Sequence, residues 1–243
     1  MSESRRIAIV QSNYIPWKGY FDLVNSVDEF VLFDDRQYTR RDWRNRNLIK
    51  TDRGTRWLTI PVLVGGQYLQ RIDEVRVAQT DWAKRHWDQL VQVYRRAPHF
   101  NRAAELLMPL YLSPQPELLS EINRSFLEAL SAILGIRTTF SWSTDYPDDS
   151  DSRAGLKTER LVSICRAAGA THYLSGPAAR DYIDASCFEA AGIHLEYFDY
   201  SDYPEYPQVH PPFAHGVSIL DLLFNTGNDA PAFMKTFATR VLA

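Results

Sequence analysis

The stretch DDRQYTRRDWRNRN, residues 34–47, gathers side chains suited to chemistry on a polar ligand. It holds two adjacent aspartates, five arginines, a tyrosine, a tryptophan and two asparagines in fourteen positions. Arginine makes paired hydrogen bonds to carboxylate or phosphate, aromatic rings offer flat apolar faces, and asparagine offers donors and acceptors together. The composition predicts a recognition surface for a polar, anionic, ring-containing ligand. The predicted binding residues are Asp35, Tyr38, Trp43, Arg44, Asn45 and Arg46, with Lys50 just beyond.

Asp34 and Asp35 directly follow the apolar run FVLF. A strand predicted over residues 30–33 would place both carboxylates at a strand end, where side chains of an open α/β sheet face the ligand crevice. One of them could act as a general base. The structural alternative is that one caps the next turn while the other pairs with a nearby arginine.

A second group of candidate ligand-binding residues follows the first predicted strand, in the segment QSNYIPWKGY. A glycine there would let the backbone approach a ligand, and the start of a helix favours an anion. The segment YLSGPAARDYID resembles it, because a hydroxyl and a glycine follow a strand; an ordinary capped turn is the alternative. The candidates in these two segments are Gln11, Tyr14, Lys18, Tyr20, Ser175, Gly176 and Tyr182.

The C-terminal segment YPQVHPPFAHGVSILDLLFNTG supplies a histidine, His215, just before an apolar helix. A histidine there could act as a base near neutral pH, or could only cap and pack. Gln208 and Asp221 are the further candidates of this segment. Ser218 lacks the setting of a serine-hydrolase nucleophile.

Length and composition describe an ordinary folded protein of 243 residues, with 45% apolar and 23% charged residues. The net charge of −3 argues against non-specific attraction of the whole molecule to nucleic acid. Eight cations between residues 36 and 56 predict a local positive field. No apolar run reaches the length of a membrane span, so the cytoplasm is the expected location. The histidines and the two cysteines show no metal-ligand spacing, so no metal is expected.

Hydrophobic periodicity predicts strands alternating with helices, which is typical of a parallel sheet with both faces covered. We predict one α/β domain over residues 1–243 with a helical insertion roughly over residues 82–134. The proline-rich residues 203–212 form either a structured loop or a lid. The predicted strands are residues 6–10, 30–33, 56–64, 74–77, 138–142, 172–174 and 193–198, and the predicted helices are 20–27, 81–96, 117–134, 156–168, 184–191, 217–224 and 230–242.

Several ordered blocks resemble the WbqC-like family. The opening QSNYIPWKGYFDLVNSVDEFVLFDDRQYTRRDWRNRNLIK is similar to that of the family, and so are YRRAPHF, YLSGPAARDYID, EYPQ and VSILDLLFNTG. This sequence differs from the family pattern at two places. Ser12 stands where the family usually has proline after the glutamine, and Arg36 and Arg40 lie within the aspartate block. A fainter likeness to pantothenate synthetase and the nucleotidyltransferases implies a Rossmann-like, mainly parallel sheet with helices on both faces.

The resemblance implies transfer of a glycyl-type aminoacyl group onto an amino sugar or similar amine, in surface-polysaccharide or natural-product biosynthesis. The donor would be a thioester on an acidic carrier protein, and no cofactor would be required. Such a reaction needs a base, donors for an oxyanion and alignment of two substrates. Asp34 or His215 would be the base. Gln11, Asn47 or the turn at Ser175 and Gly176 would bind the oxyanion.

Two other functions stay open at this point. A ligase or nucleotidyltransferase would need ATP and magnesium to activate a carboxylate, although the two histidines that stabilise the triphosphate in those enzymes are absent. A non-catalytic sugar-binding accessory protein would bind its ligand without turnover.

Overall fold

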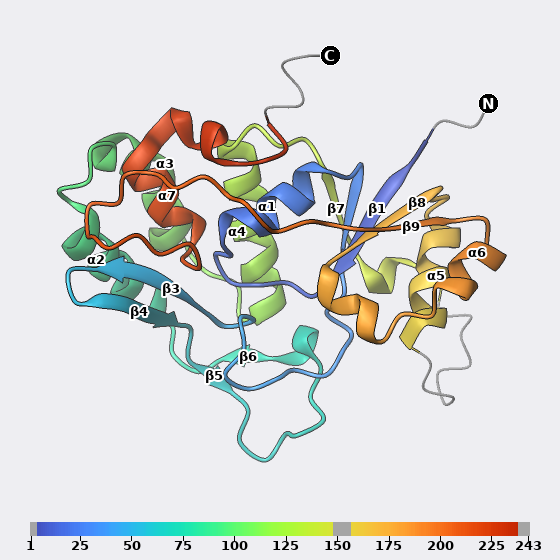
Figure 1. Ribbon diagram of the computed structural model, residues 1–243. Helices are drawn as coiled ribbons and strands as arrows, with labels where there is room; N and C mark the ends of the chain where they lie inside the picture. Colours follow the sequence, from blue (N-terminus) through green and yellow to red (C-terminus); the bar gives the residue numbers. More distant parts are fainter. Residues whose placement is uncertain (1–3, 148–156, 238–243) are drawn as a thin grey trace.

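A five-stranded parallel sheet forms the centre of the protein (Figure 1). The computed structural model describes residues 4–147 and 157–237. The strands lie in the order β7-β2-β1-β8-β9, and all neighbours are parallel. The chain order reverses between β1 and β8, as in Rossmann-like folds. The bounds are β1 Arg6–Val10, β2 Glu29–Leu32, β7 Thr139–Trp142, β8 His172–Ser175 and β9 His194–Tyr197.

Helices cover both faces of this sheet, as predicted. Alternate side chains of β1 enter different cores: Ile7 and Ile9 pack with α5 (Lys157–Ala167) and α6 (Ala185–Ala190), whereas Ala8 packs with α1 (Lys18–Asn25) and α4 (Leu119–Ile133). This alternation follows from the two-residue period of a strand. The nearly continuous apolar run RIAIV is therefore the sequence of a strand buried on both faces.

The chain between β2 and β7 adds small sheets and a helical layer. The antiparallel hairpin of β3 (Arg46–Thr51) and β4 (Gly54–Thr59) is followed by β5 (Val62–Leu63), which pairs with β6 (Arg76–Val77). Three helices come next: α2 (Trp82–Tyr94), α3 (Phe100–Leu112) and α4. They match the predicted insertion over residues 82–134, whereas the single-domain assignment stays a prediction.

Several predicted elements are wrong in extent. The strand predicted over residues 56–64 is two strands, β4 and β5, with different partners, interrupted at Pro61 because proline cannot donate to a ladder. Only Arg76–Val77 of the strand at 74–77 forms. Instead of a helix from residue 230, a 3₁₀ segment Gly227–Phe233 contains Pro231 and bends follow to residue 237. Residues 238–242 of that helix lie outside the described residues.

The elements β3 and α3 were not predicted. Three of the six residues in β3 are Arg46, Asn47 and Lys50, and this polar composition masks the strand pattern. The last α-helix among the described residues is α7 (Ile219–Thr226), which contacts α3 and β3. No helix within residues 4–147 and 157–237 has the length and apolar character that a membrane crossing requires.

Candidate functional site

Asp34 is a buried carboxylate at the carboxyl end of β2. Its side chain is 1% exposed, and the Ser12 N–H donates to Oδ1 at 2.8 Å. The other oxygen, Oδ2, is buried and has no hydrogen-bond partner among the described residues. Burial raises the pKa of Asp34 from 3.8 to about 6, against the opposing effects of Ser12 and the Arg44 charge. The group is thus a carboxylate at neutral pH with unusual proton affinity.

A cavity of about 180 Å³ opens beside Asp34, at the carboxyl ends of β2 and β7. Its lining includes four acids and, among the described residues that line it, no lysine, arginine or histidine. Trp142 adds an aromatic face. The four acids are Asp34, Asp35, Asp73 and Glu121. A cavity with this lining suits a cationic group.

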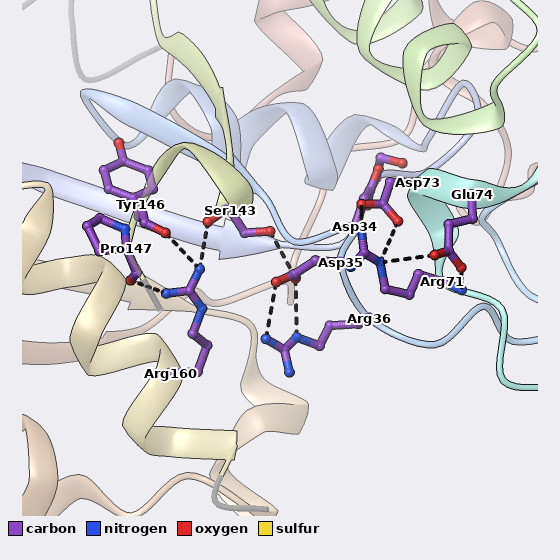
Figure 2. Close-up of polar contacts among 11 residues, drawn as sticks. Asp34, Asp35, Arg36, Arg71, Asp73, Glu74, Ser143, Tyr146, Pro147 and Arg160 are labelled. Carbon is purple, nitrogen blue, oxygen red and sulfur yellow. Dashed lines mark hydrogen bonds and ion pairs between the residues drawn. The ribbon is translucent and has the colours of Figure 1, made fainter. Parts of the chain in front are cut away.

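Two of these acids already have partners (Figure 2). Asp35 accepts from Ser143 Oγ at 2.9 Å and pairs with Arg36 at 3.2 Å. Asp73 pairs with Arg71 at 2.6 Å, and its N–H donates to the Asp34 carbonyl at 3.0 Å. Asp34 therefore stands out as the buried acid with an unused oxygen. Within the described ranges, no group of three or more His, Cys, Asp or Glu is placed to hold a metal.

Arg44 organises the carboxyl end of β1. Its two terminal nitrogens donate to Gln11 Oε1 and Asn13 Oδ1, and its side chain is only 13% exposed. These contacts fix which way each amide faces. The NH₂ groups of Gln11 and Asn13 have no acceptor among the described residues, so both can donate to a ligand. Tyr20 Oη donates to the Gln11 carbonyl at 3.1 Å and buttresses the same turn.

Asn123 on α4 joins this edge to the helical layer. It is fully buried, and its Nδ2 donates to Ser12 Oγ and to the Arg44 carbonyl, both at 2.9 Å. Sequence reasoning missed it. The available signal was an asparagine on the helix face that carries Leu119, Phe126 and Leu127, where a polar side chain needs a partner.

The stretch of residues 34–47 divides between the interior and the surface. Tyr38 is 7% exposed, Asn45 Nδ2 donates to the Ile60 carbonyl at 2.8 Å, and Asn47 Nδ2 donates to the Tyr14 carbonyl at 3.0 Å. These side chains hold the backbone together. Tyr14 belongs to the core, where its hydroxyl meets His86 at 2.9 Å and Tyr111 at 3.1 Å.

Trp43 is exposed, and Arg46 beside it is half-buried. Trp43 is 41% exposed and lies 5.1 Å from the Trp57 ring, over which the Arg46 guanidinium sits at 4.0 Å. Trp57 on β4 was not predicted as a site residue. Lys50 is buried, 3% exposed, in the adjacent strand rather than on this surface.

Lys18 is buried beneath the proline-rich segment. Its Nζ donates to the Pro204 carbonyl at 2.6 Å and lies 5.1 Å from the rings of Tyr203 and Tyr206. Burial lowers the pKa of Lys18 to about 8, with Asp22 opposing the effect. The lysine thus ties residues 203–212 to α1.

Asp221 holds the same segment from α7. It is fully buried and accepts from Tyr94 at 2.7 Å, Tyr206 at 2.8 Å and Gln208 at 2.9 Å. Residues 203–212 are therefore a structured loop in this conformation. His215 is exposed against Phe213, with ring centroids 4.6 Å apart, and does not line the cavity of Asp34.

Ser175 and Gly176 lie at the carboxyl end of β8, which neighbours β1 where the strand order reverses. Open α/β sheets bind ligands at that point. Ser175 is buried and accepts from Tyr173 Oη at 3.4 Å, while Tyr182 is 56% exposed. The turn lies across β1 from Asp34, whereas the acidic cavity lies on the β7 side.

We expect Arg44→Ala to lower the free energy of unfolding by ~1–3 kcal/mol, because it removes charged hydrogen bonds that position Gln11 and Asn13. Arg40→Ala is the control. Arg40 is exposed, and its one side-chain hydrogen bond to a described residue is with the Val64 carbonyl, so its loss should cost under ~1 kcal/mol. Urea unfolding of both variants measures the difference. Equal stabilities would show that Arg44 does not organise this edge.

The comparisons with known proteins identify the family of the chain. The sequence model of the WbqC-like protein family matches residues 11–233. The chain belongs to the WbqC-like protein family. It is similar to a protein of Mycobacterium tuberculosis with the name "Uncharacterized protein Rv1507c", with 49% identity over 231 residues, covering 95% of this chain and 98% of the relative. No solved structure matches the chain at a significant level.

Proposed function

We propose that the protein forms an amide by transferring an aminoacyl group from a carrier-bound thioester to the amine of an amino sugar or similar small molecule. The observation that carries the proposal is Asp34, a buried carboxylate with a raised pKa of about 6 and an unpaired oxygen beside an acidic cavity. An amine enters water at neutral pH as an ammonium ion, which the acidic lining would attract. The same carboxylate would then take its proton.

The reaction balances with the groups at hand. Asp34 removes a proton from the ammonium, and the free amine attacks the thioester carbonyl carbon. The C–N bond forms and the C–S bond breaks. The departing thiolate takes up the proton from Asp34, which restores the carboxylate. The nitrogen loses its second proton to solvent as the amide forms, so the overall reaction releases one proton.

The developing oxyanion needs donors that are already in place before the reaction. The NH₂ groups of Gln11 and Asn13 meet that need, because Arg44 fixes both amides by their oxygens. Ser12 connects this edge to the base through its N–H. We assign Gln11 and Asn13 as oxyanion donors, Arg44 and Asn123 as positioning residues, and Trp142 as an apolar wall for the acceptor. Asn47 and His215 receive no role in this proposal.

The carrier partner is proposed from charge. Carrier proteins are usually acidic. The exposed Trp43 and Trp57 and the half-buried Arg46 form a surface with apolar and cationic groups at the hairpin. Such a surface can bind an acidic protein with an apolar contact at its centre. In this proposal the enzyme requires no cofactor, and its product enters surface-polysaccharide or natural-product biosynthesis.

Intact-mass analysis tests the proposal directly. The purified protein is mixed with a glycyl-loaded carrier protein and a panel of amino sugars, with and without ATP and magnesium. We expect a new amide mass without ATP, and loss of that product with Asp34→Asn. Product that forms only with ATP, together with pyrophosphate or phosphate release, would assign the protein to the ligase class. Ligand binding without turnover under every condition would make it an accessory binding protein.

A further inference from the structure

A second cavity, about 650 Å³ in volume, lies at the end of the β3–β4 hairpin away from Asp34. Its walls come from the hairpin turn, the C-terminal end of α2 and His210 of the proline-rich segment, which meet at the left of Figure 1. Because β3 is six residues long, its two ends lie ~17–20 Å apart. We call this cavity the arginine hollow, after Arg53, Arg56, Arg95 and Arg96 in its lining.

The lining of the arginine hollow carries a net positive charge. The lining holds four arginines and one acid, Asp52, and within the described part of the chain none of the four guanidinium groups makes an ion pair or a hydrogen bond. Some exposed arginines elsewhere have acidic partners: Arg71 pairs with Asp73, Arg76 with Glu117 and Arg102 with Glu105. What distinguishes the arginine hollow is that its four guanidinium groups line one cavity with a single acid in its lining.

The dipole of α2 explains the position of only two of the four arginines. Arg95 and Arg96 follow the last residue of α2, where a cation stabilises the negative end of the helix dipole. Arg53 and Arg56 come from the hairpin and gain nothing from that dipole. They lie at the same cavity and add to the repulsion there, which an anion would relieve.

The walls of the hollow are held in place by buried hydrogen bonds. The Lys50 N–H donates to Tyr94 Oη at 3.1 Å, and Tyr94 Oη donates to Asp221 at 2.7 Å. His210 Nε2 meets the Val93 carbonyl at 3.2 Å and fixes the third wall. The hairpin, the helix end and the proline-rich segment are therefore positioned before any ligand arrives. Such preorganisation lowers the entropic cost of binding.

We propose that the arginine hollow is a binding site for a pyrophosphate group, free or carried by a nucleoside. Arginine matches phosphate geometry with paired donors, and clustered guanidinium groups suit an anion with several charged oxygens. A volume of about 650 Å³ accommodates a small ligand of this kind. The inference rests on the hollow alone and stands whether or not Asp34 catalyses amide formation.

Isothermal titration calorimetry at low salt tests the proposal with inorganic pyrophosphate, a nucleoside diphosphate and an oligoglutamate peptide. We expect pyrophosphate to bind and the affinity to fall as salt rises. If the nucleoside diphosphate binds more tightly than pyrophosphate, the site also contacts the nucleoside. If the two bind equally, the site contacts only the phosphates. No binding of pyrophosphate at millimolar concentration, or tighter binding of oligoglutamate, would overturn the proposal.

A matched pair of double variants locates the binding. Arg56→Gln with Arg95→Gln removes two positive charges from the hollow, and we expect affinity for pyrophosphate to fall at least about tenfold. Arg85→Gln with Arg102→Gln removes two exposed arginines outside it and should leave affinity within about twofold. Circular dichroism checks that both fold. Equal affinities in the two variants would contradict the assignment.

A measurement without substitutions guards against misfolded variants. Phenylglyoxal modifies accessible arginines, and peptide mass spectrometry reports each one. We expect pyrophosphate to slow modification of Arg53 and Arg56 at least about threefold relative to Arg102, because bound phosphate covers their donors. Unchanged modification at saturating pyrophosphate would exclude the hollow as the site.

Discussion

Asp34→Asn is expected to reduce amide formation by ~10²–10⁴-fold while making the folded protein more stable at neutral pH. Asparagine cannot accept the ammonium proton, yet it has nearly the shape of aspartate and can still accept from the Ser12 N–H. A loss of activity together with a gain of stability distinguishes a base from a structural carboxylate. If Asp34 mainly held the fold together, Asp34→Asn would lower both the activity and the stability.

The sign of the stability change follows from the pKa. The pKa of Asp34 is about 6 in the folded protein, because of burial, and about 3.8 when the group is unperturbed. The folded state therefore binds the proton more tightly than the unfolded state. The stability associated with the protonated group is fully present below pH 3.8, falls as pH rises through 6, and is lost above it. The loss amounts to ~3 kcal/mol.

Two measurements check this prediction. Urea unfolding from pH 4 to pH 8 should show that the stability of Asp34→Asn relative to the native protein rises with pH up to about 6 and then stays level. The intact-mass assay gives the activity of the same preparation. Asp88→Asn is the control, because Asp88 is an exposed partner of Lys84 on α2 and should change neither quantity. A variant with full activity would remove Asp34 from the mechanism.

How much of the site could be predicted depends on the range of the contacts. Asp34 could be found because an apolar run followed by acids marks the end of a buried strand, where open sheets bind ligands. Its surroundings could not be found. Asn123 reaches Ser12 across 111 positions of sequence, and Ser143 reaches Asp35 across 108. Local periodicity carries no information about such pairs.

Residue type also fails to say where a side chain points. Asn45 and Asn47 have the same donors and acceptors whether they bind a ligand or the backbone, and the structure uses them for the Ile60 and Tyr14 carbonyls. Both lie beside or within β3, whose polar sequence masked the strand. The parallel sheet itself was predictable, because β1 and β2 are largely apolar runs and strands alternate with helices along the chain.

Asp221→Ala is expected to lower the free energy of unfolding by about 3 kcal/mol or more. The change leaves the hydroxyls of Tyr94 and Tyr206 and the amide of Gln208 without their acceptor, and each buried unsatisfied donor costs ~1–3 kcal/mol. Burial raises the pKa of Asp221, which means that its charged form is destabilised in the interior. Removing that buried charge offsets part of the cost. Thermal unfolding should show a decrease of roughly 6–12 °C in Tm.

A control variant and a second possible result of Asp221→Ala distinguish a fixed loop at residues 203–212 from a lid. Asp229→Ala removes an exposed acid just after α7 and should shift Tm by less than ~2 °C. Because Asp221 connects that segment to α2, its loss should also loosen the His210 wall of the arginine hollow and weaken pyrophosphate binding. If Asp221→Ala instead keeps its Tm but loses amide formation, Asp221 acts on substrate. The segment over it would then have to open during the reaction, because Asp221 is fully buried.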